Sequence, residues 1–286
     1  MCTAITYQSS DFYFGRNLDL DRDYGERVTV MPRKFPFPMK CMPELTEHYA
    51  LIGMAVIADG CPLFFEATNE KGLSMAGLNF PDNAFYCEPR KGRLNLAPYE
   101  LIPWLLGKCA TLSEVKEALS RLNVVGIPFS EGLPLTPLHW IISDKSCSLT
   151  LESTKDGLKI YDNPWGVLSN NPPFDLQIRN MNKSNALPGD FSSESRFIRA
   201  AYLKEKASPK SSEDESVNQF FRMLSLVSVP EGCVLTKEGK PHFTLYSSCC
   251  NTDKGIYYYH RCDSCTVKKA DMHKCNSDGY ALCISD

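Results

Sequence analysis

CTAITYQSSDFYFGRNLD, residues 2–19, predicts the first two strands of the chain. Apolar and polar side chains alternate over residues 2–8 and 12–16, which is typical of half-buried strands. The polar residues between these segments indicate a hairpin. Because residues 15–19 follow the hairpin, we expect them to return Arg16 and Asp19 to the end of the strand at which Cys2 begins.

Alternating segments continue through the first third of the chain and return further on. We expect strands over residues 28–32, 50–58, 63–67, 73–79, 138–144, 147–153, 158–162, 167–169, 242–250 and 256–261. Turn residues at Asp144-Lys145 and Asp156-Gly157 imply antiparallel hairpins in the second block. The proline-rich residues 32–43 cannot lie in the middle of a sheet, so we expect an extended surface connection there.

Helical spacing separates the blocks of strands. Thr111-Leu112-Ser113-Glu114 has the form of a capping box, and apolar residues follow it at helical spacing. Further helices are expected over residues 97–107, 174–181, 193–206 and 217–226. The polar residues 208–216 are expected to form a mobile loop.

The order of these elements predicts the fold class. Blocks of strands alternate with blocks of helices, which favours an α+β fold with two antiparallel sheets and helices outside them over a parallel sheet. No Pro-, Gly- or Ser-rich segment is long enough to be a linker, so we expect residues 1–286 to form a single domain.

The composition excludes several classes of protein. The 286 residues include 31 Lys plus Arg and 34 Asp plus Glu, and with a net charge of −3 nucleic acid is not an expected partner. No segment reaches the roughly 18 consecutive apolar residues of a membrane span. The N-terminus lacks the features of a signal peptide, so we expect a cytoplasmic protein. The 13 cysteines lie mostly in apolar runs and are expected to be buried free thiols.

Cys2 is the candidate nucleophile. An initiator methionine is usually removed before a small residue, so we expect a mature chain that begins at Cys2 with a thiol and a free α-amine. An α-amine has an ordinary pKa of about 7.7 to 8.0 and can accept the thiol proton at neutral pH. A guanidinium favours a nearby thiolate and a carboxylate can orient an ammonium, which are roles open to Arg16 and Asp19. The alternative for these two residues is an ordinary ion pair in a surface turn.

Cys2 also belongs to an ordered set of motifs. These are Met1-Cys2-Thr3, Phe14-Gly15-Arg16-Asn17-Leu18-Asp19, Asn69-Glu70-Lys71-Gly72-Leu73, Gly77-Leu78-Asn79-Phe80-Pro81, Leu138-His139-Trp140, Val167-Leu168-Ser169-Asn170-Asn171-Pro172, Phe174-Asp175, Leu187-Pro188-Gly189-Asp190-Phe191, Ser195-Arg196-Phe197 and Tyr246-Ser247-Ser248-Cys249. In kind and order the set resembles the choloylglycine hydrolase family, the bile salt hydrolases and penicillin V acylases. An ordered set over nearly the whole chain is far more specific than one short motif. The resemblance implies the four-layer αββα sandwich of N-terminal nucleophile hydrolases.

The resemblance implies a mechanism without cofactor or metal. The sulfur of Cys2 would attack an amide carbonyl while its own α-amine moves the proton, and water would then release the acid from a thioester. Asn170 and the backbone amide of Asn79 would hold the oxyanion. The catalytic residues implied in this way are Cys2, Arg16, Asp19, Asn79, Asn170 and Arg196. Apart from the resemblance, Asn170 also fits a turn and Arg196 a solvated helix face.

Asn79 favours one branch of the family. The family commonly carries Asn at this position in bile salt hydrolases and Tyr in penicillin V acylases. The resemblance thus implies hydrolysis of glycine- or taurine-conjugated bile salts, with penicillin V or another N-acyl amide as the alternative substrate. A steroid acyl group needs an apolar wall. The candidate lining residues, each of which also fits a plain core position, are Leu18, Phe65, Leu133 and Leu138.

The chain departs from the family in one segment. Family members carry a longer arm between the Asn-Pro and Pro-Gly-Asp motifs, which reaches a neighbouring subunit. Only residues 176–187 separate Asp175 from Pro188 here. The resemblance implies a homo-oligomer, but this short arm does not support the family's tetramer.

Two alternative interpretations belong to other classes. Cys262-Asp263-Ser264-Cys265 with His273, Cys275 or Cys283 could bind zinc, although the spacing is loose for a zinc site. The other alternative is a non-catalytic protein that binds steroid amides. No histidine is paired with a motif cysteine, so a Cys–His dyad is not expected, and His139 is interpreted as a packed structural residue.

Overall fold

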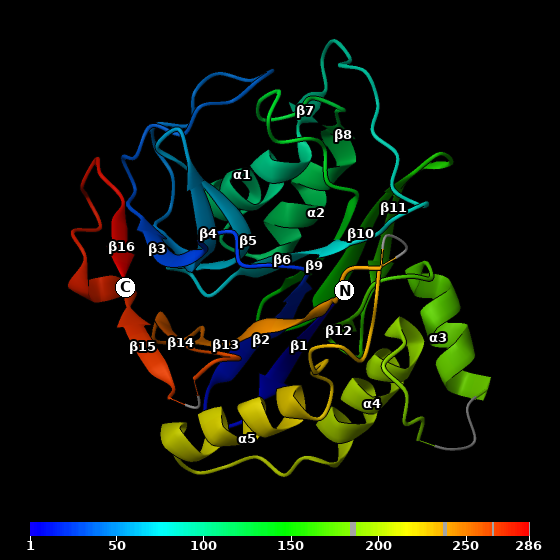
Figure 1. Ribbon diagram of the computed structural model, residues 1–286. Coiled ribbons are helices and arrows are strands. Elements are labelled where there is room, and N and C mark those ends of the chain that lie inside the picture. Colours follow the sequence, from blue (N-terminus) through cyan, green and yellow to red (C-terminus); the bar gives the residue numbers. More distant parts are fainter. Residues whose placement is uncertain (184–186, 237–238, 265, 286) are drawn as a thin grey trace.

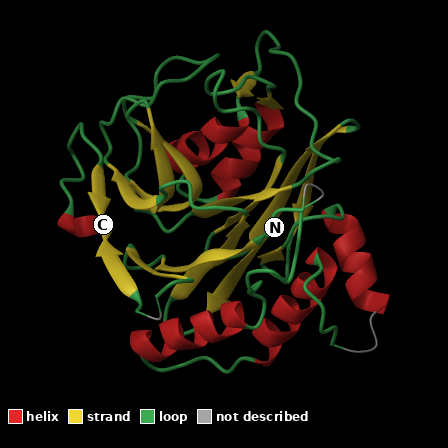
Figure 2. Cartoon of the chain, viewed as in Figure 1, coloured by secondary structure: helices red, strands yellow, loops and turns green. Residues whose placement is uncertain are grey.

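Two antiparallel sheets lie face to face, and helices cover the outer face of each (Figure 1). The computed structural model describes residues 1–183, 187–236, 239–264 and 266–285. Colouring by secondary structure shows the order of the layers, with helices, two sheets and helices in turn (Figure 2). The predicted α+β fold of αββα form is therefore confirmed.

The first sheet joins the two ends of the sequence. Its strand order is β12 (Val167–Leu168), β1 (Cys2–Gln8), β2 (Phe12–Leu20), β13 (Phe243–Asn251), β14 (Ile256–Arg261) and β15 (Lys268–Asp271). Because β2 pairs with both β1 and β13, Leu18 lies between Cys2 on one side and Tyr246 on the other. The first residue of the expected mature chain thus lies inside a sheet.

The second sheet is formed mainly by the middle of the chain. Its strand order is β11 (Gly157–Asp162), β10 (Ser148–Thr154), β9 (Leu138–Ser143), β6 (Ser74–Asn79), β5 (Cys61–Asn69), β4 (Leu51–Ala58), β3 (Arg27–Met31) and β16 (Cys283–Ser285). A separate parallel pair, β7 (Leu94–Leu96) and β8 (Leu122–Val124), was not predicted, because three residues are too few to show alternation.

The helices divide between the two outer faces. The second sheet is covered by η1 (Pro98–Glu100), α1 (Leu101–Lys108) and α2 (Leu112–Arg121), and the first by α4 (Ser193–Lys206) and α5 (Glu213–Ser225), beside α3 (Phe174–Lys183). The Thr111 side chain accepts a hydrogen bond from the backbone N–H of Glu114 (3.3 Å), as the capping motif predicted. A short turn, η2 (Met272–Lys274), precedes β16. No helix in the described segments is long and apolar enough to cross a membrane.

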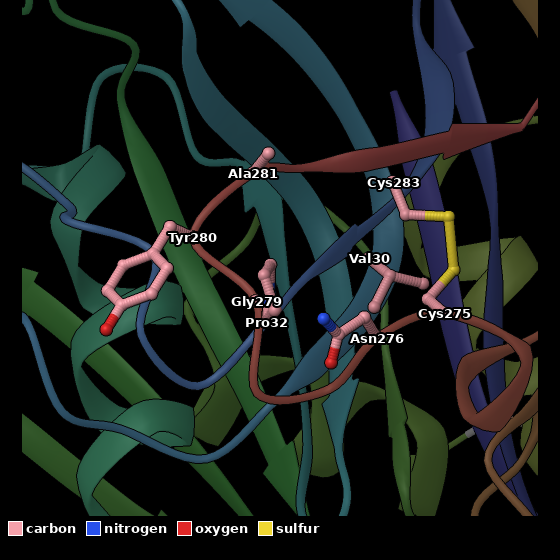
Figure 3. Close-up of a pocket in the computed structure, with 8 residues that line it drawn as sticks. All are labelled: Val30, Pro32, Cys275, Asn276, Gly279, Tyr280, Ala281 and Cys283. Atoms are coloured by element: carbon pink, nitrogen blue, oxygen red, sulfur yellow. A yellow bond between two sulfur atoms is a disulfide. The ribbon is translucent and has the colours of Figure 1, made fainter.

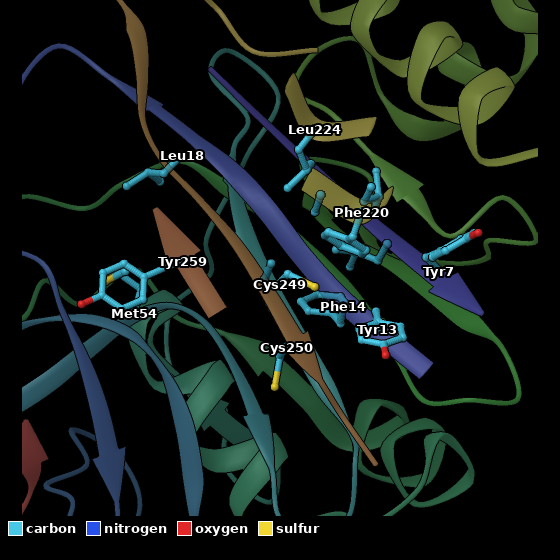
Figure 4. Close-up of a cluster of buried hydrophobic side chains, with 14 of the residues drawn as sticks. Tyr7, Tyr13, Phe14, Leu18, Met54, Phe220, Leu224, Cys249, Cys250 and Tyr259 are labelled. Atoms are coloured by element: carbon cyan, nitrogen blue, oxygen red, sulfur yellow. The ribbon is translucent and has the colours of Figure 1, made fainter. Parts of the chain in front are cut away.

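Alternation along the strands divides the apolar side chains between two clusters. In β6, Met75 packs with α1 and α2, whereas Ala76 and Leu78 face the first sheet. The larger cluster fills the space between the sheets and continues under α4 and α5, where Phe14 and Phe220 lie (Figure 4). The site described below is held between these packed layers.

Two predicted loops differ from the structure. Residues 32–43 are not only a surface connection, because Phe37 is fully buried in the cluster beneath α1 and α2. Residues 208–216 are not a continuous loop, because α5 begins at Glu213 with Ser212 as its N-cap. The polar first turn of α5 lacks apolar periodicity, but its acidic side chains suit a helix N-terminus.

The cysteine prediction is only partly confirmed. Buried free thiols are Cys2, Cys61, Cys109, Cys249 and Cys250. The prediction is wrong for the exposed thiols Cys147, Cys233 and Cys262, and for Cys275 and Cys283, which form a disulfide. These five lie in loops or short elements near the surface, where apolar context no longer predicts burial.

Candidate active site

Cys2 begins β1 and is 2% exposed. It lies opposite Leu18 in the antiparallel pair of β1 and β2, so the segment 15–19 does return beside it. The segment is not a surface turn, as the alternative would have it, but part of β2 with Arg16 and Asp19 fully buried. The backbone N–H of Cys2 donates to Oδ1 of Asn170 (2.5 Å).

Met1 covers the amino side of Cys2. The Met1 amine donates to the carbonyl oxygen of Asp19 (2.8 Å) and lies 3.1 Å from Nδ1 of His242. Burial lowers the pKa of this amine, although the nearby Cys2 and Asp19 act in the opposite direction. While Met1 is attached, the Cys2 nitrogen is a peptide nitrogen and cannot act as a base.

Arg16 places a buried guanidinium close to Cys2. Its Nη1 donates to the carbonyl oxygens of Gly77 (2.6 Å) and Phe65 (3.1 Å) on the opposite sheet. Burial disfavours the charged form, but ionisable neighbours, Cys2 foremost, raise the pKa of Arg16 above its ordinary value. The Nη2 atom is buried without a hydrogen-bond partner among the described residues, so it is free to donate to a bound group.

Glu66 lies beneath Arg16, with 3.8 Å between Oε2 and Nη1. It accepts hydrogen bonds from the hydroxyls of Tyr246 (2.7 Å), Ser248 (3.1 Å) and Tyr257. Burial raises the pKa of this carboxyl, and Arg16 opposes that shift. Because Glu66 belongs to β5 and its donors to β13 and β14, this polar network joins the two sheets under the site.

Asp19 supplies a buried carboxylate on the other side of Cys2. Its Oδ1 accepts a hydrogen bond from the Thr244 hydroxyl (2.6 Å), and its Oδ2 lies 3.7 Å from Nη1 of Arg196. Within the described part of the chain, Oδ2 has no hydrogen-bond partner. A buried carboxylate oxygen in this state can accept a further donor, such as an ammonium.

Arg196 lies on α4 and is fully buried, so the alternative of a solvated helix face is wrong. Its Nη1 donates to the carbonyl oxygen of Cys2 (2.5 Å) and to the Thr3 hydroxyl (2.5 Å), and its Nη2 donates to Oδ1 of Asn170 (3.0 Å). Burial lowers the pKa of Arg196, and Asp19 opposes this shift. Arg196 thereby connects α4 to β1 and to the segment after β12.

Asn170 and Asn79 lie side by side. The Nδ2 of Asn170 donates to the carbonyl oxygen of Asn79 (2.7 Å), which ends β6. The backbone N–H of Asn170 donates to the Ser193 hydroxyl (2.8 Å), and its carbonyl oxygen accepts from Gln177 (2.6 Å). Since an amide nitrogen carries two hydrogens, Nδ2 keeps one for a further acceptor.

The four candidate lining residues occupy different environments. Leu18 is buried opposite Cys2, and Phe65 packs against the cluster between the sheets. Leu138 lies opposite Asn79 in the pair of β6 and β9, and it is half-buried. Leu133 is 38% exposed in the loop before β9, so the chain itself does not bury this side chain.

The chain also has a pocket away from Cys2. This pocket of about 340 Å³ lies between Pro32 and the Cys275–Cys283 disulfide (Figure 3). None of its lining residues belongs to the predicted site. It does not contribute to the chemistry around Cys2.

The structure does not favour the zinc hypothesis. The disulfide occupies Cys275 and Cys283, two of the proposed ligands, and Cys265 lies outside the described residues. Among the described residues, no group of three or more His, Cys, Asp or Glu side chains is placed to hold a metal ion.

Sequence reasoning missed three residues that contact the site or the Met1 amine beside it. Thr244 bonds Asp19 across 225 positions of sequence, and a lone threonine gives no signal of such a contact. Glu66 had a signal that was not used, because a carboxylate within the apolar run 63–67 of a predicted strand needs a buried partner. His242, near the Met1 amine, was likewise not predicted.

Known proteins are similar to this chain over nearly its whole length. The family model described as linear amide C–N hydrolases, choloylglycine hydrolase family, matches residues 2–186 and 183–285. A bile salt hydrolase/transferase from Lactiplantibacillus plantarum is 45% identical over 96% of this chain and 93% of its own. One from Clostridium perfringens is 36% identical over 99% and 95%, respectively.

Solved structures agree with the fold. A mutant conjugated bile acid hydrolase from Clostridium perfringens superposes with a TM-score of 0.93 at 35% identity, covering 100% of this chain and 97% of that one. The penicillin V acylase from Agrobacterium tumefaciens gives a TM-score of 0.83 at 20% identity, covering 98% and 90%, which shows a shared fold.

Proposed function

This chain belongs to the choloylglycine hydrolase family of linear amide C–N hydrolases, and we propose that it hydrolyses the amide bond of glycine- or taurine-conjugated bile salts. The observation that carries the proposal is the convergence of separate segments on one buried cysteine. Arg16, Asp19, Asn170 and Arg196 surround Cys2 with direct or shared hydrogen bonds and charges. The names of the similar proteins from Lactiplantibacillus plantarum and Clostridium perfringens support the substrate class.

The nucleophile is the thiol of Cys2 in a chain that has lost Met1. Removal of Met1 converts the Cys2 nitrogen from a peptide nitrogen into an α-amine. This amine takes the thiol proton as sulfur attacks the amide carbonyl, and it then gives the proton to the leaving amine. A thioester on Cys2 results, and water activated by the same amine releases the bile acid. No cofactor or metal takes part.

The charges around Cys2 suit these steps. The Oδ2 of Asp19, which has no hydrogen-bond partner among the described residues, can hold the new ammonium, and Arg196 fixes the carbonyl oxygen of Cys2. Arg16 presents a positive charge to the thiolate and keeps Nη2 for a bound group.

The oxyanion of the tetrahedral intermediate is held by Asn170 and Asn79. The remaining Nδ2 hydrogen of Asn170 and the backbone N–H of Asn79 are the donors. The contact of 2.7 Å between Asn170 and the Asn79 carbonyl supports a joint role, because it fixes the two residues relative to each other. Losing one donor of this kind typically raises the barrier by about 2.7 to 4 kcal/mol.

The acyl group is expected to meet an apolar surface. Leu18, Phe65 and Leu138 are the proposed inner contacts, with Leu133 at the outer end, where a steroid would cover its exposed side chain. We further propose that residues 1–286 act as one domain and that the active form is a homo-oligomer, for which the short arm of residues 176–187 does not support the family's tetramer.

The direct test is amine release from three substrates in parallel: glycocholate, taurocholate and penicillin V. Intact mass first establishes the fraction of the preparation that begins at Cys2. We expect bile salts to be cleaved at least tenfold faster than penicillin V, with Cys2→Ala inactive. Cys249→Ala is the matched control, because it removes another buried free thiol outside the proposed machinery.

Preferred cleavage of penicillin V would contradict the proposed bile salt substrate but would agree with the assignment as an amide hydrolase. If a preparation that begins at Cys2 cleaved none of the three substrates, the proposed enzymatic activity would be refuted.

A further inference from the structure

A buried histidine lies behind the proposed oxyanion donors. His139, on β9, is fully buried, and its ring stacks on Phe80 with a centroid separation of 4.2 Å and an interplanar angle of 6°. Its Nε2 lies 2.7 Å from the carbonyl oxygen of Ser169, and its Nδ1 lies 3.2 Å from Oε1 of Glu152. All polar atoms of the ring therefore have partners.

These contacts belong to a closed ring of contacts, here called the circuit, that runs from His139 through the segments of Phe80 and Ser169 and back. Phe80 follows Asn79 in the chain, and Ser169 precedes Asn170. His139 thus holds the neighbour of each proposed donor, and the circuit closes where Nδ2 of Asn170 donates to the carbonyl oxygen of Asn79 (2.7 Å). One side chain fixes the spacing of two segments that lie about 90 residues apart in sequence.

The direction of the Ser169 hydrogen bond follows from chemistry. A carbonyl oxygen can only accept, so Nε2 of His139 carries a hydrogen and donates it. Nδ1 and Oε1 of Glu152 share the second contact of the ring. An imidazole held between a carbonyl and a carboxylate cannot rotate without breaking one of these hydrogen bonds.

Glu152 extends the support to a helix. Its Oε1 also accepts the backbone N–H of Phe174 (2.9 Å), the first residue of α3. Gln177, one turn further on, donates to the carbonyl oxygen of Asn170 (2.6 Å). The pair of His139 and Glu152 therefore links β9 and β10 to the helix that holds Asn170.

We infer that His139 is a positioning residue that sets the separation of the oxyanion donors Asn79 and Asn170. This inference rests on the proposed function for its catalytic meaning. His139 does not touch the reacting atoms. It acts through Phe80 on one side and Ser169 on the other, so its loss should impair the stabilisation of the oxyanion while leaving the nucleophile intact.

Two variants test the stacking of His139 on Phe80 and its hydrogen bond to Ser169 separately. His139→Phe keeps an aromatic face for Phe80 but removes the donor to Ser169. His139→Gln keeps a donor but removes the ring. We expect His139→Phe to lower kcat by about 10- to 100-fold with KM within about threefold, since small displacements of catalytic groups cost this much. The loss in His139→Gln should be smaller if its amide reaches the Ser169 carbonyl.

The rate at which iodoacetamide alkylates Cys2 distinguishes positioning from general packing. If His139 served only to pack the site, its loss would also change this rate. This displacement at carbon forms no tetrahedral oxyanion, so it reports the nucleophile alone. We expect both variants to be alkylated within about twofold of the wild-type rate. A parallel fall in alkylation and turnover would overturn the inference, as would full kcat in a folded His139→Phe.

His48 provides the matched control. It is also buried, and its ring nitrogens lie 2.8 and 2.9 Å from the carbonyl oxygens of Tyr49 and Phe35. His48→Phe should lower the melting temperature but leave kcat unchanged. An equal loss of kcat in His139→Phe and His48→Phe would show that the effect comes from lost stability and would overturn the inference. If His139→Phe does not fold, His139→Gln carries the test alone.

Crystal structures separate this inference from the proposed function. In His139→Phe we expect the distance from Nδ2 of Asn170 to the Asn79 carbonyl to exceed hydrogen-bond range. An unchanged distance would refute positioning even if no substrate were found. Absence of wild-type turnover with a lengthened contact would refute the proposed function and leave positioning in place.

Discussion

At the scale of single residues, the site consists of buried charges that are held by hydrogen bonds. Asp19 and Arg196 are both fully buried; the Asp19 carboxylate accepts a hydrogen bond from Thr244, and the Arg196 guanidinium donates four to other described residues. A buried charge that loses a partner is costly, because no water replaces the lost bond. We therefore expect substitution of the residues that hydrogen-bond these charges to lower both stability and activity.

Thr244 gives the first prediction. Its hydroxyl donates to Asp19 (2.6 Å) and accepts the backbone N–H of Val229 (2.9 Å). Thr244→Val should destabilise the chain by about 1 to 3 kcal/mol, because both buried partners lose a bond. It should also lower kcat, since Asp19 is no longer fixed.

Denaturant unfolding and amine release measure the two effects. Thr244→Ser keeps the hydroxyl and is the control, with activity near wild type. Equal behaviour of the Val and Ser variants would show that Asp19 does not depend on this hydrogen bond.

At the scale of residues, the sequence predicted which side chains lie close together where they belong to one motif or to neighbouring strands. Cys2, Arg16 and Asp19 were expected to meet because strand alternation and a hairpin bring them together. Arg196 could be placed only through the family resemblance, since its helix gave no sign of full burial. Thr244 could not be predicted at all, because its contact depends on the pairing of β2 with β13.

At the scale of elements, β2 is the strand on which the site depends. It is hydrogen-bonded to β1 and β13, and it carries Arg16 and Asp19. Gly15 lies where β2 runs close to β13. A Cβ added at Gly15 would lie 2.0 Å from the carbonyl oxygen of Ser248, well inside any allowed contact.

Gly15→Ala should therefore destabilise the chain by about 3 kcal/mol or more, because one strand must move away from the other. Urea unfolding is the measurement. Gly132→Ala is the control, since its added Cβ would meet nothing within 4 Å, and it should change stability by less than about 0.5 kcal/mol. A tolerated Gly15→Ala would mean that the two strands can separate without cost.

Element boundaries were predictable where local patterns were strong. The expected bounds of β1, α4 and β14 agree with the structure. The strands β7, β8 and β16 have only three residues each, and they form because distant partners supply their hydrogen bonds. Local sequence holds little information about such pairing.

At the scale of the whole molecule, the two sheets are joined by polar contacts as well as by the apolar cluster. Glu66 connects β5 to Tyr246, Ser248 and Tyr257 on the opposite sheet. Burial raises its pKa, so the folded chain holds a proton on Glu66 at pH values where the unfolded chain has released it. The stability that this proton contributes is present below the ordinary pKa and is lost as pH rises through the folded pKa.

Glu66→Gln tests this sign. The amide cannot titrate, so wild type should lose stability relative to Glu66→Gln as pH rises from about 4, by at most about 1.4 kcal/mol per pH unit. Unfolding free energies measured from pH 4 to 8 report the difference. Ser248→Ala removes one donor but keeps the carboxyl, so it should retain the pH dependence. A constant difference between wild type and Glu66→Gln would contradict the raised pKa.

The architecture of the whole chain was predictable because blocks of strands and helices follow one another. What could not be predicted was the pairing of the chain's two ends in one sheet, or the C-terminal segment that crosses from β15 in one sheet to β16 in the other. These contacts are set by packing between layers, which leaves no local pattern in the sequence.

The central claim is that the thiol of an N-terminal Cys2 carries the acyl group. The most direct measurement is rapid mixing of the Met1-free chain with glycocholate or taurocholate, acid quenching, and mass analysis of the N-terminal peptide. We predict a cholyl thioester on Cys2 that forms before steady state and is removed by hydroxylamine. Turnover without any adduct on Cys2, or with the acyl group on another residue, would contradict this mechanism.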